Sequence, residues 1–332
     1  MRAELTNPAG EGTAVNLSRQ RALRSALPAV SLVLLLLLIW AFNPRAISYF
    51  GLNLMLNLAI PIALATIAQM CVMATNELDL SIGAFIGYVA CVTGTFMASQ
   101  PALAVLMLAA GILVYMLAAA VIYMRAIPSI VVTLGLSFFW GGLALLIRPT
   151  PGGRAPEFLT KFLSWQPPLV PLPVVLSLVL ALSVHLLLMS SSYGTILRGS
   201  GGNERAIGRA GWSILKAKVT MFALAGFFGV LSGMLLVGVS SSADATMASG
   251  YTLLSIAGAV IGGAEFVGGR ISPIGAVIGA LVLQLASSAL NFLQVPFLPG
   301  GRIPQEWQVG AQGFFLILIL AARVLISRSN SK

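Results

Sequence analysis

Charge is the scarcest property of this 332-residue sequence, because only 8% of its residues are Asp, Glu, Lys or Arg. A soluble domain carries about 25%. Hydrophobic residues make up 58% of the chain, and the mean hydropathy is +0.97. So few charges cannot cover a water-soluble surface, so most apolar side chains must face lipid or one another. The sequence therefore excludes a soluble globular protein and predicts an integral membrane protein.

Histidine, cysteine and aspartate are also rare, and each shortage excludes a kind of chemistry. The single histidine, His185, lies in an apolar run, and Cys71 and Cys91 have no metal-ligand or redox spacing. P-loop, H-E-x-x-H and G-x-S-x-G motifs are absent. The two aspartates, Asp79 and Asp244, fall on opposite predicted sides of the membrane, which argues against an intramembrane protease. We expect no catalytic, cofactor-binding or metal-ligating residue.

The basic residues outnumber the acidic ones, 19 to 9, and give a net charge of +10. They lie singly between apolar runs and not in aromatic-interleaved stretches, so nucleic acid is not an expected partner. Their distribution is the one that membrane loops show under the positive-inside rule. The expected surroundings of the chain are a lipid bilayer.

Apolar runs divide the chain into spans, since a bilayer core of about 30 Å needs roughly 20 apolar residues per helix. A polar stretch, 1–26, predicts a disordered cytoplasmic tail, and 27–328 predicts the transmembrane domain. The eighth run is too short to cross comfortably, which indicates a half-helix supported by neighbouring protein. About ten runs are found, at 27–42, 51–74, 82–99, 102–124, 127–147, 168–189, 217–240, 252–264, 273–295 and 307–326.

An even number of spans places both termini on one side of the membrane. With the N-terminus inside, fourteen Lys and Arg residues fall inside and five outside. The positive-inside rule favours this orientation and predicts cytoplasmic N- and C-termini. The longest outer connection, 148–168, holds five prolines and two glycines and predicts an extended loop that resists helix formation.

A polar break interrupts the apolar sequence between the second and third spans, at Asn76, Glu77, Asp79 and Ser81. Acidic side chains beside a membrane span are costly, so these residues are functional candidates, for a polar pathway through the membrane or its gate. Asp79 or Ser81 could instead cap the third span. The two interpretations are compatible, and both remain open here.

Glycines spaced four apart recur inside three spans, at Gly83 with Gly87, at Gly258 with Gly262, and at Gly275 with Gly279. This spacing is typical of closely packed membrane helices, and it also suits helices that shift past one another in alternating access. Three residues at the end of the short eighth span complete the pathway and gate candidates, namely Gly262, Gly263 and Glu265.

The inner connection, 190–216, predicts a docking element. Asn203 can cap a short helix that carries Glu204, Ala206 and Ile207, and Gly211 can end it. So short a helix is marginal alone in water, so we expect it to dock on a cytoplasmic partner.

Three ordered motifs resemble those of bacterial ABC-importer permeases of the ribose and other monosaccharide type. The string GNERAIGRAG at 202–211 is similar to their cytoplasmic coupling segment, and ELDLSIG at 77–83 to their G-I-D-L-S-V-G signature. The string AVIGGAEFVGGRISPIGAVIGA at 259–280 is similar to a third, glycine-rich signature. The resemblance implies that eight residues couple this chain to the ATPase, namely Gly202, Asn203, Glu204, Arg205, Ala206, Ile207, Gly208 and Gly211.

The resemblance implies an all-α polytopic permease of the type II ABC importer-like arrangement in the bacterial inner membrane. It implies a non-enzymatic subunit that translocates a monosaccharide, polyol or related small carbohydrate. A second permease subunit, identical or different, a periplasmic substrate-binding protein and an ABC ATP-binding subunit, which uses ATP and Mg, are the implied partners. No cofactor is expected in this chain.

The sequence departs from the family pattern at Asn76-Glu77, where Gly-Gly is usual, at Ala264-Glu265, where Thr-Ser is usual, and at Ala210, where Ser is usual. A branched-chain amino acid permease shares the distant fold and is the nearest alternative, against which the D-L-S-I-G string argues. A passive channel would leave the docking loop without a purpose, and an intramembrane enzyme lacks a converging acid–base or metal constellation.

Overall fold

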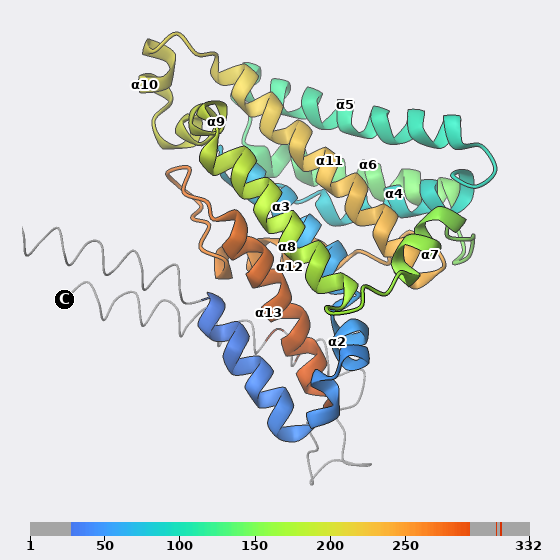
Figure 1. Ribbon diagram of the computed structural model, residues 1–332. Coiled ribbons are helices and arrows are strands. Elements are labelled where there is room, and N and C mark those ends of the chain that lie inside the picture. Colours follow the sequence, from blue (N-terminus) through green and yellow to red (C-terminus); the bar gives the residue numbers. More distant parts are fainter. Residues whose placement is uncertain (1–27, 293–309, 311–312, 314–332) are drawn as a thin grey trace, which may run out of the picture.

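The computed structural model describes residues 28–292 together with 310 and 313, and its regular elements within that range are helices (Figure 1). This confirms the predicted all-α architecture. The tail at 1–26, the tenth predicted span at 307–326 and the C-terminus lie outside the described residues.

Each of the first nine predicted spans is occupied by a helix. The second is divided into α2 and α3, which are bent by 45°, and the sixth ends in a π-helical turn, Leu186–Ser190. In chain order the elements are a first helix Pro28–Phe42, a 3-10 turn Pro44–Ile47, α2 Tyr49–Leu56, α3 Ala59–Met73, α4 Ile82–Phe96, α5 Pro101–Arg125, α6 Ser129–Ile147, α7 Glu157–Ser164, α8 Leu172–His185, α9 Ser192–Gly202, α10 Glu204–Arg209, α11 Ile214–Ser240, α12 Tyr251–Ile261 and α13 Pro273–Phe292.

Four of these helices are long and apolar enough to cross a membrane by themselves, namely α5, α6, α8 with its π-helical turn, and α11. The bent pair α2 and α3 makes a fifth. Within the fifth, α3 is buried over its whole length, and the shorter helix α4 is buried over most of its length. Surrounding protein, and not lipid, therefore contacts α3 and α4, so neither needs a full bilayer-spanning length.

The core forms around α3, which packs against α11, α12 and α13. A cluster of aromatic rings, Phe85, Tyr88, Tyr115 and Trp140, joins α4 to α5 and α6, with ring centroids 4.8 to 4.9 Å apart for the Phe85–Tyr115 and Tyr88–Trp140 pairs. α5 and α6 instead leave leucines such as Leu106 and Leu146 exposed, as lipid-facing helices do. Cys71 and Cys91 are both buried.

The glycine faces pack as the spacing predicts. A Cβ on Gly262 would collide with the backbone of Gly275, and one on Gly279 would collide with the carbonyl of Gly258, so α12 and α13 touch backbone to backbone. A Cβ on Gly83 would lie 2.7 Å from the carbonyl oxygen of Ala248. Only glycine leaves room for such approaches.

The eighth span is the short helix that its length predicts. α12 ends at Ile261, and Gly263 turns the chain away with φ +105°. Its side chains are mostly buried against α3, α4 and α13, although Leu253 is 72% exposed.

The prediction for the outer connection is wrong in one respect, because Glu157–Ser164 forms α7. This stretch lies between Pro156 and Pro167 and contains neither proline nor glycine, so it is free to form helix. An ion pair of 2.7 Å joins Glu157 to Lys161 one turn later, and Leu159 is buried.

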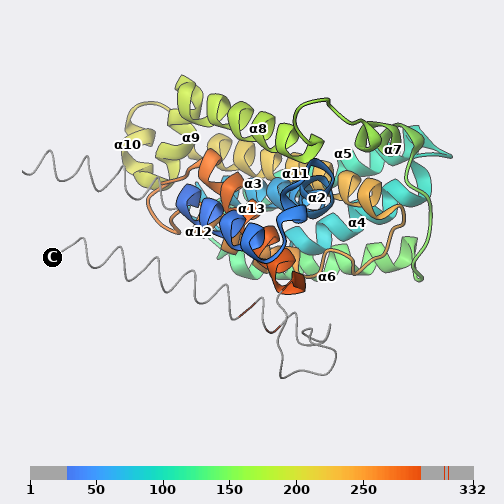
Figure 2. The same cartoon turned by 60° about the horizontal axis from the view of Figure 1, so that its bottom comes forward.

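The connections gather at two ends of the bundle (Figures 1 and 2). α9 and α10 lie at one end and α7 at the other. We name them after the predicted orientation: the inner end comprises 75–81, 126–128, 191–213 and 262–272, and the outer end comprises 43–48, 97–100, 148–171 and 241–250.

Candidate functional site

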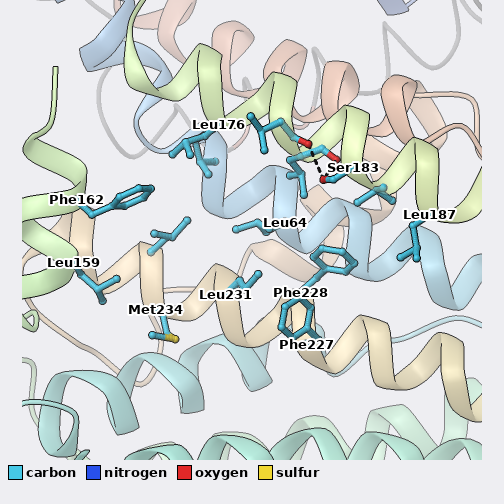
Figure 3. A pocket seen from close by; sticks show the side chains of 15 residues that line it. Leu64, Leu159, Phe162, Leu176, Ser183, Leu187, Phe227, Phe228, Leu231 and Met234 are labelled. Carbon is cyan, nitrogen blue, oxygen red and sulfur yellow. Dashed lines mark hydrogen bonds between the residues drawn. The ribbon is translucent and has the colours of Figure 1, made fainter. Parts of the chain in front are cut away.

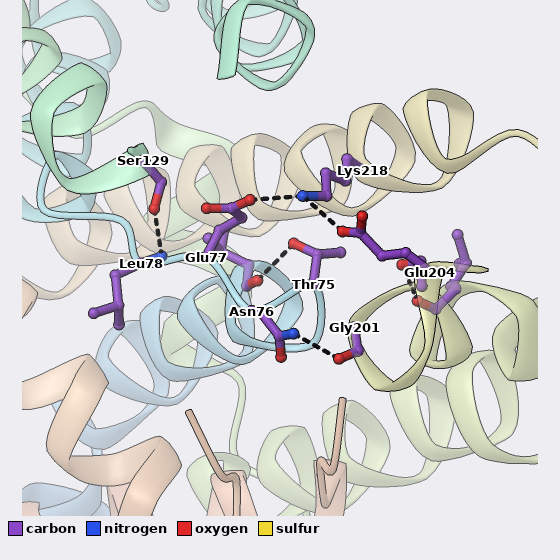
Figure 4. Close-up of polar contacts among 11 residues, drawn as sticks. Thr75, Asn76, Glu77, Leu78, Ser129, Gly201, Glu204 and Lys218 are labelled. Carbon is purple, nitrogen blue, oxygen red and sulfur yellow. Dashed lines mark hydrogen bonds and ion pairs between the residues drawn. The ribbon is translucent and has the colours of Figure 1, made fainter. Parts of the chain in front are cut away.

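Asn76 joins three connections at the inner end. Its Nδ2 donates to the carbonyl oxygen of Gly201 at 2.6 Å (Figure 4), and its Oδ1 accepts from the backbone N–H of Gly268 at 2.9 Å. Its own backbone is left-handed, with φ +60°, a conformation that asparagine tolerates better than most residues. One side chain thus links the polar break to the coupling region and to the third motif.

Glycines allow these connections to meet. A Cβ on Gly201 would collide with the carbonyl of Ala74, and one on Gly269 would collide with that of Arg198. Gly269 also has a left-handed φ of +65°. The three motifs, distant in sequence, therefore converge on one site.

Lys218 bridges two carboxylates at this site, as Figure 4 shows. Its Nζ lies 2.7 Å from Oε1 of Glu77 and 3.1 Å from Oε1 of Glu204, and 5.8 Å from the centroid of the Tyr123 ring. The Lys218 side chain is 9% exposed, that of Glu77 14% and that of Glu204 46%. None of the sequence motifs includes Lys218, although a cation at the second position of a predicted apolar span is a signal for a functional residue.

Hydrogen bonds from α6 hold the rest of the polar break in place. Ser129 Oγ accepts from the backbone N–H of Leu78 at 3.0 Å, and Thr133 Oγ1 accepts from that of Leu80 at 3.1 Å. Thr133 Oγ1 also donates to the carbonyl oxygen of Leu78 at 3.3 Å. The 75–81 connection is therefore anchored along its length.

Asp79 is fully buried beneath this connection and accepts three hydrogen bonds. Ser81 donates from its backbone N–H at 2.7 Å and from its Oγ at 2.6 Å, and the Tyr115 hydroxyl donates at 2.8 Å. Burial raises the pKa of Asp79, while the hydrogen bonds from Ser81 and Tyr115 act to lower it. The carboxyl group thus joins the inner connection to α5.

The capping interpretation is wrong for Ser81. Ser81 is the N-cap residue of α4, but its side chain makes no capping hydrogen bond there. Its hydroxyl is oriented toward Asp79, to which it donates at 2.6 Å, and toward the Tyr115 hydroxyl at 3.1 Å, and so it supplies a donor to the buried carboxyl.

The coupling helix α10 forms as predicted. Asn203 Oδ1 accepts from the N–H of Ala206 at 3.0 Å, and Gly211 follows the helix with φ +84°. Gly202, Asn203, Arg205, Ala206 and Gly208 are exposed.

Two side chains of α10 turn inward. Glu204 reaches Lys218, and Ile207 is half-buried, its Cδ1 lying 2.7 Å from where a Cβ on Gly199 would be. Ala206 therefore presents the apolar surface, together with Trp212, which is 48% exposed and lies just beyond the 202–211 motif.

The pathway and gate candidates of the third motif occupy different surroundings. Gly262 packs on Gly275, and Gly263 forms the turn after α12. The Glu265 carboxylate is paired with Arg270 at 3.7 Å on the exposed 262–272 connection. Glu265 and Glu77, the two carboxylates that depart from the family pattern, thus have separate cationic partners.

A cavity of about 370 Å³ lies in the outer half of the bundle, between α3, α11, α12 and α13. This volume falls within the range of small-molecule sites, about 300–1,000 Å³. Its lining residues combine apolar and uncharged polar side chains, namely Leu58, Ile62, Leu236, Ser240, Met247, Tyr251, Leu254, Leu283, Gln284 and Ser287.

A larger cavity of about 590 Å³ lies between α3, α7, α8 and α11 (Figure 3). It is lined by leucine, phenylalanine and other apolar side chains, with Ser183 as the polar exception. The Ser183 hydroxyl donates to the carbonyl of Val179 at 2.6 Å. A polar solute would lose its hydrogen bonds to water there, so this cavity is unsuited to one.

The chain matches the protein family described as "Branched-chain amino acid transport system / permease component" over residues 51–320. The autoinducer 2 import system permease protein LsrD of Enterobacter sp. (strain 638) is 28% identical over 306 residues, which cover 89% of this chain and 91% of that protein. The ribose import permease protein RbsC of Escherichia coli (strain K12) is 26% identical over 80% of this chain and 86% of its own length.

The probable ABC transporter permease protein YphD of Escherichia coli (strain K12) is 26% identical over 91% of this chain and 90% of its own length. No solved structure matches the chain at a significant level. The family match spans most of the helical bundle, including all three motifs that meet at its inner end. The chain therefore belongs to this family of transport-system permeases and is a multi-pass protein of the inner membrane.

Proposed function

We propose that this chain is the membrane-spanning subunit of an ATP-driven importer for a monosaccharide, polyol or related small carbohydrate. The observation that carries the proposal is the exposed coupling helix α10, which Lys218 ties to the polar break by contacting both Glu204 and Glu77. Asn76 joins the same break to the preceding helix α9 through Gly201. Relatives named for ribose and autoinducer 2 import support the same class of transport.

Partners follow from this proposal. An ABC ATP-binding subunit, which holds ATP and Mg, would bind α10 through Ala206 and the residues around it. A periplasmic substrate-binding protein would deliver solute to the outer end, and a second permease subunit would complete the pathway. No cofactor is assigned to this chain itself.

The proposed orientation puts the inner end in the cytoplasm. Of the described basic residues, seven lie at that end, namely Arg125, Arg198, Arg205, Arg209, Lys216, Lys218 and Arg270, and four at the other, namely Arg45, Arg148, Arg154 and Lys161. Positive charge is retained on the cytoplasmic side of membrane proteins. Both termini would then be cytoplasmic.

The 370 Å³ cavity supports a neutral solute. Tyr251, Gln284 and Ser240 contribute uncharged polar groups, and the lining residues include no charged side chain. Sugar hydroxyls can bind such groups, whereas the two charges of an amino acid would be costly to bury without ionic partners. This observation favours a carbohydrate over a branched-chain amino acid, the substrate named in the family description.

Glycine packing closes the bundle on the inner side of this cavity. A Cβ on Gly258 would lie 2.9 Å from Thr66 Oγ1, and Gly262 contacts Gly275 one turn further inward. Alternating access would require these contacts to separate as ATP binding in the partner shifts the balance between two states.

Reconstitution in proteoliposomes tests the proposal. We expect uptake of labelled ribose or a related sugar only when the ATP-binding subunit, the binding protein and ATP are present. Uptake by the permease alone would indicate a passive channel. ATP-driven uptake of leucine in place of sugars would establish the branched-chain amino acid alternative.

A further inference from the structure

Three segments meet at Lys218: its own helix α11, the 75–81 connection through Glu77, and the coupling helix through Glu204. We propose that Lys218 is a positioning residue that ties α10 to the 75–81 connection, so that displacement of α10 by a docked partner moves that connection. The inference rests on the proposed function and identifies the contact through which coupling would pass.

The environment of Lys218 distinguishes this pair from an ordinary surface ion pair. Exposed ion pairs are screened by water and contribute little. Here the Lys218 side chain is 9% exposed and the Glu77 side chain 14% exposed, so the attraction between their charges is less screened. A buried charge also needs its partners to remain in place, because losing one leaves the other uncompensated.

The contact with Glu204 gives α10 a fixed position. α10 has six residues and is too short to be stable by itself. Within the described residues, α10 is held from the bundle side by Ile207 against Gly199 and by Glu204 on Lys218. The Glu204 side chain is 46% exposed, so water could solvate its carboxylate. Its Oε1 nevertheless lies 3.1 Å from Lys218 Nζ.

If Lys218 moved, the 75–81 connection would transmit the movement to the elements that it contacts. Leu78 and Leu80 bind α6, and Asn76 binds Gly268 of the 262–272 connection. Coupling between distant sites is carried by such contiguous contacts between ordered elements. Lys218 thus links α10 to the 75–81 connection directly, and through Asn76 to the 262–272 connection, which follows the packed Gly262.

Hydrogen exchange on the full-length permease in lipid nanodiscs tests the link without any partner. We expect Lys218→Gln and Glu204→Gln to speed exchange of the α10 amides by at least about fivefold, a typical size for coupled contacts. Lys216→Gln is the matched control, because Lys216 is exposed on the same helix and makes no ion pair among the described residues. Unchanged α10 exchange in Lys218→Gln would overturn the proposal.

Transport per ATP hydrolysed, measured in the reconstituted importer, separates positioning from simple neutralisation of Glu77. We expect Lys218→Gln to lose at least about fivefold in this ratio, and Lys218→Arg to retain most of it. The double variant Glu77→Gln/Lys218→Gln leaves no buried carboxylate without a partner, because the remaining Glu204 is 46% exposed to solvent. Folding is therefore protected, and we expect the double variant to stay uncoupled. Recovery of wild-type coupling in the double variant would show that Lys218 only neutralises Glu77.

A different result is expected if the proposed transport function itself is wrong. In that case the wild-type complex would show no ATP-driven uptake, while the α10 exchange result would still decide whether Lys218 holds the coupling helix.

Discussion

The side-chain amide nitrogen of Asn76 donates to the carbonyl oxygen of Gly201 at 2.6 Å, which joins residues 125 positions apart in the chain. The same side chain accepts from the N–H of Gly268. The polar break, the coupling region and the glycine-rich motif are therefore one structural unit at the inner end of the bundle.

Replacing Asn76 tests that unit. We expect Asn76→Ala to destabilise the permease by about 1–3 kcal/mol, because two hydrogen bonds are lost and alanine must adopt a left-handed φ. Thermal unfolding in detergent measures the effect. Asn76→Gly is the control for backbone strain, and it should be the more stable of the two variants. Wild-type stability in both would contradict the linking role.

The exposed position of Ala206 makes it the test of docking. We expect Ala206→Arg to leave folding and membrane insertion intact but to abolish co-purification of the ATP-binding subunit and transport. Ala102→Arg, exposed at the start of α5 on the outer end, is the matched control and should co-purify normally. Normal transport by Ala206→Arg would remove the coupling assignment.

The backbone contact between Gly262 and Gly275 leaves no room for a side chain. We expect Gly262→Leu to destabilise the protein by about 3 kcal/mol or more, since inserted methylenes cost about 1–3 kcal/mol even without a backbone collision. Gly250→Leu is the control, because nothing lies within 4 Å of a Cβ at Gly250. Equal melting temperatures for the two variants would show that α12 and α13 can separate freely.

Asp79→Asn separates hydrogen bonding from charge at the buried carboxyl. Asparagine retains an acceptor for Tyr115, so we expect the variant to fold, whereas Asp79→Ala should lose about 1–3 kcal/mol. Transport lost with stability retained in Asp79→Asn would indicate a pathway role; loss of both would indicate a structural one. Unchanged transport in both Asp79→Ala and Glu77→Ala would exclude these carboxyls from the gate.

The raised pKa of Asp79 also predicts a pH dependence. Between the unfolded and the raised folded pKa, the folded state binds a proton that the unfolded state lacks, so stability falls as pH rises through that window. Asp79→Asn has no such group, so its stability should vary less over the same pH range. Parallel pH profiles of the two melting temperatures would contradict this expectation.

Gln284 and Tyr251 test the outer cavity. We expect Gln284→Leu and Tyr251→Phe to lower sugar transport by about tenfold or less each, the effect of one lost hydrogen bond to a solute. Basal ATP hydrolysis should not change. Ser183→Ala in the apolar cavity is the comparison and should transport normally; equal losses in all three would indicate a general effect on packing.

Much of this architecture could be predicted from the sequence, because it depends on local properties. Apolar runs located helices at each of the first nine predicted spans, the 13-residue eighth run predicted the short α12, and Asn203 predicted the cap of α10. The spacing of Gly258, Gly262, Gly275 and Gly279 predicted close helix contacts, since that spacing puts small residues on one helical face.

Only the tertiary structure decided which distant groups meet. Lys218 pairs with Glu77 across 141 positions, and Ser81 donates to Asp79 where capping was an alternative. α7 formed where proline content predicted an extended loop, because its eight residues lie between the prolines. The sequence by itself determines helix length, helix ends and the chemical groups available. Which side chains pair with one another depends on which helices pack together and on how deeply those helices bury a charge. No local sequence pattern encodes either.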